Sequence, residues 1–356
     1  FNNRLKLNLA GRYDKNENFA GRFTPRVTAL VKLAEDNNLR LSYQQAYRFP
    51  TTQNQWINLP TASAIVLGGL PSLKTYYKMD VNPVYSVQNV QAYGAAFQTA
   101  YAQALMGGAT QQQAFGAAAT SAKSVLKPYQ FPEYKAESMN SFELGYKGLL
   151  AHKRLLVDAY VFFSTYQNFL GRIVVIQSKS QLADPLGATG LIQLNPDAST
   201  NGSRQVYSIS TNASEKVKVF GWGLSADYRF DNGWSLGGNI AYNELKENNL
   251  PAGFLAYWAT PKTRFNINFS NNQLWKHYGF NIVYHYQSSM TYESDFVIGE
   301  APSFGYVDMQ ISRRLPRIRS MIKLGASNVF NQYYQTGIGN PSIGGLYYIS
   351  FGYNVF

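Results

Sequence analysis

The sequence predicts an all-β fold, a transmembrane antiparallel β-barrel with about twelve strands and long extracellular loops. Three observations support this prediction. Apolar and polar residues alternate with a period of two along most of the 356 residues, aromatic residues are abundant (27 Tyr and 22 Phe), and short connections alternate with longer ones. No stretch approaches the roughly 20 apolar residues of a membrane-spanning helix, so a helical membrane protein is excluded. Cysteine is absent, which fits a chain that crosses an oxidising compartment but indicates one only weakly.

The alternation is clearest in residues 39–49. The apolar set is Leu39, Leu41, Tyr43, Tyr47 and Phe49, and the polar set between them is Arg40, Ser42, Gln44 and Arg48. Successive side chains of a strand point to opposite faces, so this pattern predicts a strand with lipid on one side and water or polar groups on the other. The same division recurs around Phe142, Trp222 and Phe265.

The strands are expected near residues 3–14, 22–34, 39–49, 138–150, 155–177, 205–230, 234–245, 260–270, 278–294, 304–315, 321–337 and 345–356. Several exceed the roughly ten residues needed to cross a bilayer, so they should project beyond it. The short connections are residues 35–38, 151–154, 231–233, 271–277 and 316–320. Because outer-membrane barrels have short periplasmic turns and longer extracellular loops, this short set is expected to face the periplasm.

A soluble β-sandwich would alternate in the same way and is the structural alternative. The long strands, the aromatic content and the continuous apolar faces count against it. A sandwich of this size would need a second sheet to cover those faces.

Two segments resemble the barrel of TonB-dependent outer-membrane receptors. In residues 23–51, one strand begins near Pro25 and Arg26, and after a polar turn the next strand ends at Arg48 and Pro50. The closing segment resembles the last hairpin of the same family through Asn328-Val329-Phe330, the Tyr333 and Tyr334 pair, a Gly-rich loop and a terminal aromatic residue. The resemblance covers essentially the whole chain. It implies the C-terminal part of a barrel of about 22 strands around an N-terminal plug.

The resemblance also implies what lies outside the chain. Phe1 stands within an alternating segment, with no initiator Met or apolar signal segment before it, so residues 1–356 are expected to be the C-terminal portion of the barrel. A signal peptide, the plug domain and about ten strands would then lie upstream.

The function that the resemblance implies is uptake of a scarce, bulky ligand, such as a siderophore, vitamin, glycan or peptide. The periplasmic protein TonB would energise this uptake through the missing N-terminal part. A passive porin-like channel and a structural or adhesive barrel in a larger outer-membrane complex are the alternatives.

The end of the chain resembles the signal that the barrel assembly machinery recognises. Its expected residues are Phe351, Gly352, Tyr353, Val355 and Phe356, although Phe356 is out of phase with the apolar face. Besides this machinery and TonB, the expected partners are outer-membrane lipid and lipopolysaccharide, with a partner protein of the outer membrane as an open alternative.

The longest connection, residues 50–137, is too long for an unstructured loop in a compact protein and is expected to be an extracellular loop with two short helices. The candidates for ligand contact in this loop are Tyr76, Tyr77, Tyr85, Tyr93, Phe97 and Tyr101. The last three recur at i+4 spacing and so share one helix face. They could line a lid over the barrel mouth, or they could pack the loop onto its neighbours, and both interpretations stay open.

The formal net charge is +12, and many of the basic residues lie on the polar faces of the strands, which point into the lumen of a barrel. The charges concerned are Arg4, Lys6, Arg12, Arg22, Arg26, Arg40 and Arg48, with Glu143, Asp158 and Asp227 as inward acidic groups. A lumen is not a nucleic-acid groove, so no nucleic-acid partner is expected. Acidic groups on the plug are the expected partners of the cations, because unpaired charges are costly to desolvate. An attractive field for an anionic ligand is the alternative.

An enzymatic function is not expected. Outer-membrane phospholipases are barrels that use Ser and His, and His285 lies close to Ser288 and Ser289, but the alternation places His285 on the polar face of its strand. Adjacent polar residues alone do not make a nucleophile and a base. With three histidines in the whole chain, no metal site, cofactor or catalytic residue is predicted.

Overall fold

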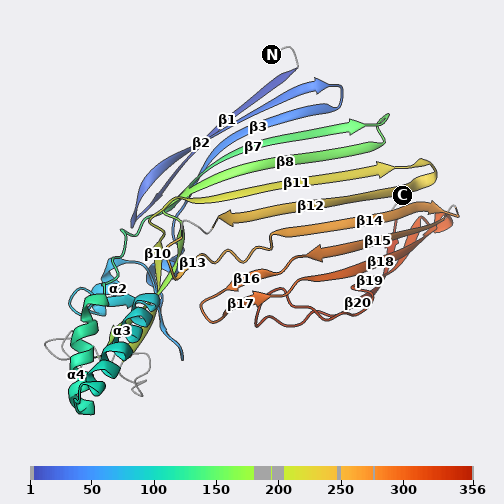
Figure 1. The fold of residues 1–356 in the computed structure, drawn as a ribbon. Helices are drawn as coiled ribbons and strands as arrows, with labels where there is room; N and C mark the ends of the chain where they lie inside the picture. The colour runs from blue at the N-terminus through green and yellow to red at the C-terminus, as the bar shows by residue number, and fades with distance from the viewer. Residues whose placement is uncertain (1–3, 180–193, 195–203, 247–249, 276, 355–356) are drawn as a thin grey trace.

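The computed structural model describes residues 4–179, 194, 204–246, 250–275 and 277–354 (Figure 1). Its main feature is a curved antiparallel sheet of twelve strands that follow one another in chain order. These strands are β1 (Leu5–Asn16), β2 (Phe19–Ala34), β3 (Asn37–Arg48), β7 (Glu137–Leu150), β8 (Leu155–Gln167), β11 (Val217–Arg229), β12 (Trp234–Lys246), β14 (Thr263–Leu274), β15 (Tyr278–Gln287), β18 (Phe304–Leu315), β19 (Ser320–Ser327) and β20 (Leu346–Tyr353). The predicted all-β fold with about twelve antiparallel strands is confirmed.

One face of this sheet exposes large apolar side chains across its whole width. They include Leu9, Phe23, Leu41, Phe142, Phe163, Leu236, Ile267, Ile311, Leu324 and Ile349. Leu9 and Ile349, on the two edge strands, are 73% and 75% exposed. Leaving such a side chain in water instead of burying it forfeits about 1.5–3 kcal/mol. No described strand covers this face, so it is the lipid-facing side of a barrel wall and not the inner side of a sandwich.

The two edges of the sheet each have a single neighbour. β1 pairs with β2 and β20 pairs with β19, and within the described residues neither edge pairs with a further strand. Figure 1 shows β1 and β20 at opposite ends of the curved wall. The sheet is therefore part of a barrel and is not closed on itself.

The short connections gather at one end of the sheet, at the right of Figure 1. They are residues 35–36, 151–154, 231–233 and 316–319 and the connection between Leu274 and Tyr278; residues 231–233 and 316–318 form 3₁₀ turns. Ion pairs join neighbouring turns: Lys153 Nζ lies 3.0 Å from Asp36 and an Arg154 guanidinium nitrogen 2.9 Å from Asp231. The opposite end carries the long connections, together with the short turn at residues 17–18.

The long connections build a lobe beyond this opposite end, at the lower left of Figure 1. Its sheet runs in the order β13-β9-β10-β5-β4, with β6 beside β9. The strands are β4 (Asn58–Pro60), β5 (Ile65–Leu67), β6 (Val84–Ser86), β9 (Leu170–Ser178), β10 (Arg204–Asn212) and β13 (Phe254–Leu255), and a separate hairpin pairs β16 (Met290–Glu293) with β17 (Ile298–Ala301). The helices are α1 (Thr52–Trp56), α2 (Pro71–Tyr76), α3 (Val87–Met106) and α4 (Gln111–Ala122), followed by a 3₁₀ turn at Lys123–Val125.

The two helices predicted in the long connection are α3 and α4, but α3 has 20 residues and is not short. Ser86 caps α3 by accepting a hydrogen bond from the Asn89 backbone N–H, and Thr110 forms a capping box with Gln113 at the start of α4. Gly108, with φ of +84°, lies between them. No helix of the described residues is long and apolar enough to cross a membrane.

Three of the predicted strands are each two strands in the structure, and one of them, 278–294, is β15 followed by β16. The segment 155–177 divides at Asn168, whose φ of +53° is a left-handed conformation that Asn tolerates. The segment 205–230 divides at residues 213–216. The chain leaves the barrel wall between β8 and β9 and returns to it between β10 and β11. β9 and β10 are buried on both faces, so the alternation gave no sign of where the wall strands end. The predicted strand 321–337 ends at Ser327, because Asn328 and Asn331 also have positive φ.

Candidate functional site

A cavity of about 420 Å³ lies where the barrel wall meets the lobe. The wall contributes the loop-side ends of β3, β7 and β8, and the lobe contributes α1, β9, the loop after β13 and the turn of the β16–β17 hairpin. Its lining includes Arg48, Asn54, Tyr134, Glu137, Tyr166, Arg172, Tyr257, Trp258 and Asp295. The cavity is thus rich in aromatic rings and contains charges of both signs.

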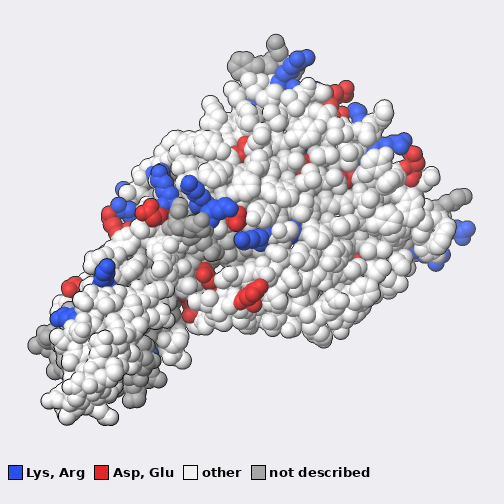
Figure 2. All heavy atoms as spheres, viewed as in Figure 1, with Lys and Arg blue, Asp and Glu red and all other residues white. Residues whose placement is uncertain are grey.

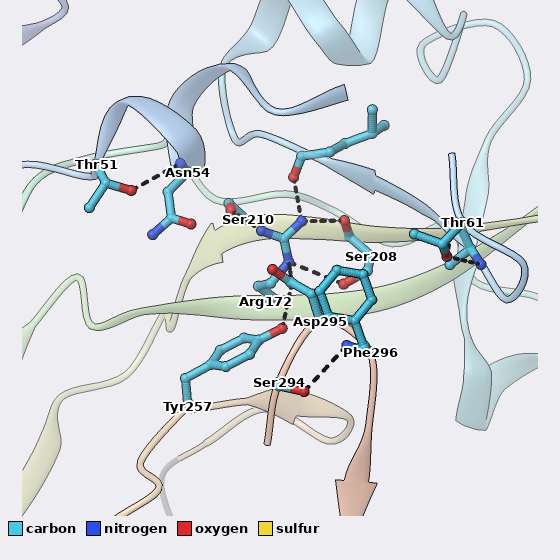
Figure 3. Close-up of polar contacts among 12 residues, drawn as sticks. Thr51, Asn54, Thr61, Arg172, Ser208, Ser210, Tyr257, Ser294, Asp295 and Phe296 are labelled. Atoms are coloured by element: carbon cyan, nitrogen blue, oxygen red, sulfur yellow. Dashed lines mark hydrogen bonds and ion pairs between the residues drawn. The ribbon is translucent and has the colours of Figure 1, made fainter. Parts of the chain in front are cut away.

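Arg172 is the most buried charge of this site, with 3% of its surface exposed. Its guanidinium donates hydrogen bonds to the Ser208 and Ser210 hydroxyls at 3.1 and 2.8 Å, and to the backbone carbonyls of Leu67 and Ser208 at 2.8 and 2.7 Å (Figure 3). Its Nε also lies 3.1 Å from Asp295. Burial lowers the pKa of Arg172, and the Asp295 charge opposes that shift.

Asp295 connects Arg172 to a third segment. The Tyr257 hydroxyl donates a hydrogen bond of 2.8 Å to the Asp295 carboxylate (Figure 3). The Tyr257 backbone N–H donates one of 2.8 Å to Glu293. Burial first, and then the hydrogen bond to Asp295, raise the pKa of Tyr257, so the phenol stays protonated and keeps donating. Tyr257 has a φ of +51°, a conformation that costs a non-glycine residue about 1–3 kcal/mol. The contacts at Asp295 and Glu293 hold it there.

A second ion pair lies on the wall side of the cavity. The buried Glu137 carboxylate accepts a hydrogen bond of 3.0 Å from Arg48 and another of 2.9 Å from the Leu170 backbone N–H. Both cations that line the cavity, Arg48 and Arg172, therefore lie against a carboxylate.

The predicted lumen charges fall into two groups. Arg40 lies 2.6 Å from Glu143, Arg48 3.0 Å from Glu137, Lys147 3.4 Å from Asp158 and Arg12 2.7 Å from Asp14, so these charges pair within the wall. Arg22 lies over the ring of Tyr47, 5.6 Å from its centroid. Among the described residues Arg4, Lys6, Arg26 and Asp227 make no ion pair.

The predicted ligand-contacting aromatic residues are mostly in the core of the lobe. Tyr85, Tyr93 and Phe97 are at most 1% exposed and pack with Ala118, Ala119 and Leu194. Their burial in this core agrees with the packing interpretation. Tyr101 is half-buried and stacks on Phe97. Tyr77 packs against Tyr207, whereas Tyr76 is 73% exposed. None of the six lines the cavity at the wall.

His285 is held by polar neighbours on the lumen face. Its Nδ1 lies 2.6 Å from the Asn266 amide oxygen, its Nε2 lies 3.1 Å from Asp308, and its ring stacks on Tyr306. The Ser288 hydroxyl instead donates to the Ser289 carbonyl, so no Ser–His pair is formed there. The described part of the chain contains no group of three His, Asp or Glu side chains that could hold a metal ion.

The predicted assembly signal lies on β20, where Phe351 and Tyr353 are exposed on the apolar face with Tyr347 and Ile349. Gly352 is on the opposite face, and Val355 and Phe356 lie outside the described residues.

Arg172, Tyr257 and Asp295 are the site residues that sequence reasoning missed. Arg172 stands just before the apolar run Ile173–Ile176, and a charge at that place was a usable sign of a buried polar contact. Its partner Asp295 is more than a hundred positions away, and no local pattern connects the two.

Comparisons with known proteins agree with this architecture. The sequence model of the family described as "TonB dependent receptor-like, beta-barrel" matches residues 1–331. The fold is similar to the solved structures of the siderophore receptor PirA from Acinetobacter baumannii, with a TM-score of 0.55, and of a mutant of the ferric enterobactin receptor PfeA from Pseudomonas aeruginosa, with a TM-score of 0.56. Each is 12% identical to this chain. A search of curated proteins found no match.

The similarity covers 99% of this chain and 43% of PirA, and 98% of this chain and 42% of PfeA, so the chain spans about two fifths of the length of these receptors. At this identity the likeness shows the fold. The family match extends over most of the chain and agrees with the lipid-facing wall and the polar inner face. The chain therefore belongs to the TonB-dependent receptor family, a family of outer-membrane transporters and not of enzymes, and forms part of its β-barrel.

Proposed function

We propose that this chain is the C-terminal portion of the barrel of a receptor that takes up a scarce, bulky ligand across the outer membrane, with energy supplied through TonB. The observation that carries the proposal is the open wall. Twelve strands expose an apolar face to lipid, yet both edge strands lack a second neighbour among the described residues. Unpaired backbone groups are not tolerated in the hydrocarbon of a bilayer, so further strands of the same receptor would complete the wall.

The remaining part of the receptor would also supply the plug. Arg4, Lys6 and Arg26 carry charges on the lumen side without an acidic partner among the described residues. Acidic groups on a plug would compensate these cations. The chain spans only about two fifths of the length of PirA and PfeA, which leaves room for a plug in a receptor of that size. TonB would act on that plug from the periplasm.

A passive channel is the second candidate function. It requires β1 to pair directly with β20 and close a barrel of these twelve strands alone. The cavity of about 420 Å³ beside the buried Arg172 does not support such a channel, because a simple pore does not require a pocket of this kind.

The first test is the intact mass and N-terminal sequence of the protein extracted from native outer membranes. The proposal expects a polypeptide more than twice this length, with a plug-like segment ahead of residue 1. A mature chain close to 39.9 kDa would favour the passive channel instead. The second test is uptake: a protonophore that collapses the inner-membrane potential should abolish ligand uptake and leave surface binding unchanged.

A further inference from the structure

We infer that the cavity between the wall and the lobe binds an uncharged, hydroxyl-rich ligand of the oligosaccharide class, and not an anionic ferric chelate. This inference rests on the proposed function, because it names the ligand that the receptor would take up. It is carried by the charge balance of the cavity, by the neutral hydrogen-bonding groups in its lining, and by the aromatic rings around them.

The charge balance excludes a strong attraction for anions. The two cations in the lining are Arg48 and Arg172, and the two carboxylates are Glu137 and Asp295, so the formal charges cancel. Each cation already lies against a carboxylate, at 3.0 and 3.1 Å. The Arg48 side chain is 62% exposed and keeps donors free, but an anionic ligand that bound them would lie beside Glu137, which adds repulsion to the cost of desolvation.

Arg172 also has few donors left for a ligand. Four of its hydrogen bonds go to Ser208, Ser210 and the Leu67 carbonyl. Figure 3 shows the guanidinium enclosed between the strand that carries the two serines and the loop that carries Asp295. The geometry assigns Arg172 to the support of the cavity wall, and a bidentate grip on a bound anion would need donors that are already in use.

Two neutral groups of the lining make no hydrogen bond within the described residues. The Trp258 indole N–H is buried and has no hydrogen-bond partner among the described residues. The side-chain amide of Asn54 also makes no hydrogen bond within the described part of the chain, since its contact with Thr51 uses the backbone N–H. An indole N–H and an amide both pair well with hydroxyl groups, so a ligand whose binding shifts the Trp258 ring enough to expose its N–H would satisfy a donor that the protein leaves unpaired.

Aromatic rings surround these polar groups. Tyr134, Tyr166 and Phe169 line the cavity together with Tyr257 and Trp258. Flat apolar rings that alternate with neutral hydrogen-bonding groups suit a sugar, which presents C–H faces and a rim of hydroxyls. The volume of about 420 Å³ lies within the usual range of ligand pockets.

The surface around the cavity does not steer anions either. Residues 81–122, which include α3 and α4, contain no Lys, Arg, Asp or Glu. On the face shown in Figure 2, the lobe carries few charged side chains, and blue and red groups are mixed over its junction with the wall. On this face, the charge excess of the chain therefore does not gather as a cationic patch over the junction.

The test is ligand binding by the purified full-length receptor in detergent. The probes are a printed array of neutral oligosaccharides and, by calorimetry, ferric enterobactin as an anionic chelate. We expect saturable binding of at least one neutral oligosaccharide that changes less than twofold between 50 and 500 mM NaCl, with no detectable binding of the ferric chelate. Trp258→Ala and Asn54→Ala should each weaken oligosaccharide binding about tenfold or more.

Two further variants keep the test decisive. Trp258→Phe retains a ring and loses the N–H, so it should give an intermediate loss even if the alanine variant folds poorly. Met106→Ala, at an 81% exposed position at the end of α3, is the matched control and should bind like the native receptor. Salt-sensitive binding of the ferric chelate that the Trp258 variants abolish, or no binding of any neutral oligosaccharide on the array, would overturn the inference.

Failure of this inference is distinguishable from failure of the proposed function. Binding by the purified receptor needs no energy and reports the ligand class alone. Uptake by cells with and without a protonophore reports the energised function alone. Energised uptake of a ferric chelate that is insensitive to Trp258→Ala would reject the inference of an oligosaccharide ligand, but it would still support the proposed function as an energised receptor.

Discussion

At the scale of single residues, the junction of wall and lobe depends on Arg172. Its side chain joins β9 to β10 and β5 through Ser208, Ser210 and the Leu67 carbonyl, and it joins the lobe to the β16–β17 hairpin through Asp295. A buried ion pair of this kind contributes little when it is compared with an apolar replacement of the whole pair, but removing one partner leaves the other unsatisfied. The site is thus sensitive to single substitutions.

Arg172→Met should destabilise the lobe by about 3 kcal/mol, because Asp295 loses its cation and two serines lose their donor. Amide hydrogen exchange measures this loss: protection of β9 and β10 should fall by roughly 100-fold, whereas β1–β3 should keep theirs. Lys123→Met, at an exposed position after α4, is the control and should leave exchange unchanged. Equal protection in the Arg172 and Lys123 variants would show that the buried pair does not hold the lobe together.

At the scale of elements, strands of the wall and strands of the lobe differ in how far the sequence predicts them. The wall strands have one lipid face and one polar face, so the alternation predicts their number and most of their bounds. β9 and β10 are buried on both faces and continue directly from β8 and into β11, so their sequence reads as an extension of the wall. The helix α3 was predictable from the i+4 spacing of its aromatic residues, but the burial of that aromatic face was not, because it depends on Leu194 and Ile176 from other segments.

Phe97 is the residue that tests the packing of the helical lobe. It is 1% exposed and contacts the rings of Tyr93, Tyr101 and Phe115. Phe97→Ala should destabilise the α3–α4 pair by about 3–5 kcal/mol. Limited proteolysis of the full receptor should then cleave within residues 87–122 at least tenfold faster than in Tyr76→Ala, a variant at an exposed tyrosine of the same loop. Similar cleavage rates for both variants would contradict the assignment of Phe97 to the core.

At the scale of the whole molecule, the position of the bilayer follows from which face of each strand is apolar. Leu224 and Ser225 are neighbours on β11 that point to opposite faces, Leu224 toward lipid and Ser225 toward the lumen, where it lies opposite Asp158 and Asn239. Leu224→Arg should lower the stability of the full receptor by about 2–4 kcal/mol, and Ser225→Arg should be close to neutral. Urea unfolding in lipid vesicles measures the stability of both variants, with the folded fraction read from the heat-modifiable migration of the protein on a gel. Equal destabilisation by both variants would mean that the assignment of the faces is wrong.

The edges of the wall decide whether these twelve strands are sufficient. Each unpaired N–H or C=O in hydrocarbon costs several kcal/mol, and the outer edges of β1 and β20 together present a row of such groups along strands of 12 and 8 residues. If strands elsewhere in the receptor cover these edges, residues 1–356 refolded alone into vesicles should fail to give a protease-resistant, heat-modifiable species, whereas the full receptor should give one. If β1 instead pairs with β20, the chain alone should fold and conduct ions, and disulfide crosslinking between cysteines placed at Leu9 and Ile349 should join the two edges. The closure of the wall therefore separates an energised receptor from a passive pore by a measurement that needs no knowledge of the ligand.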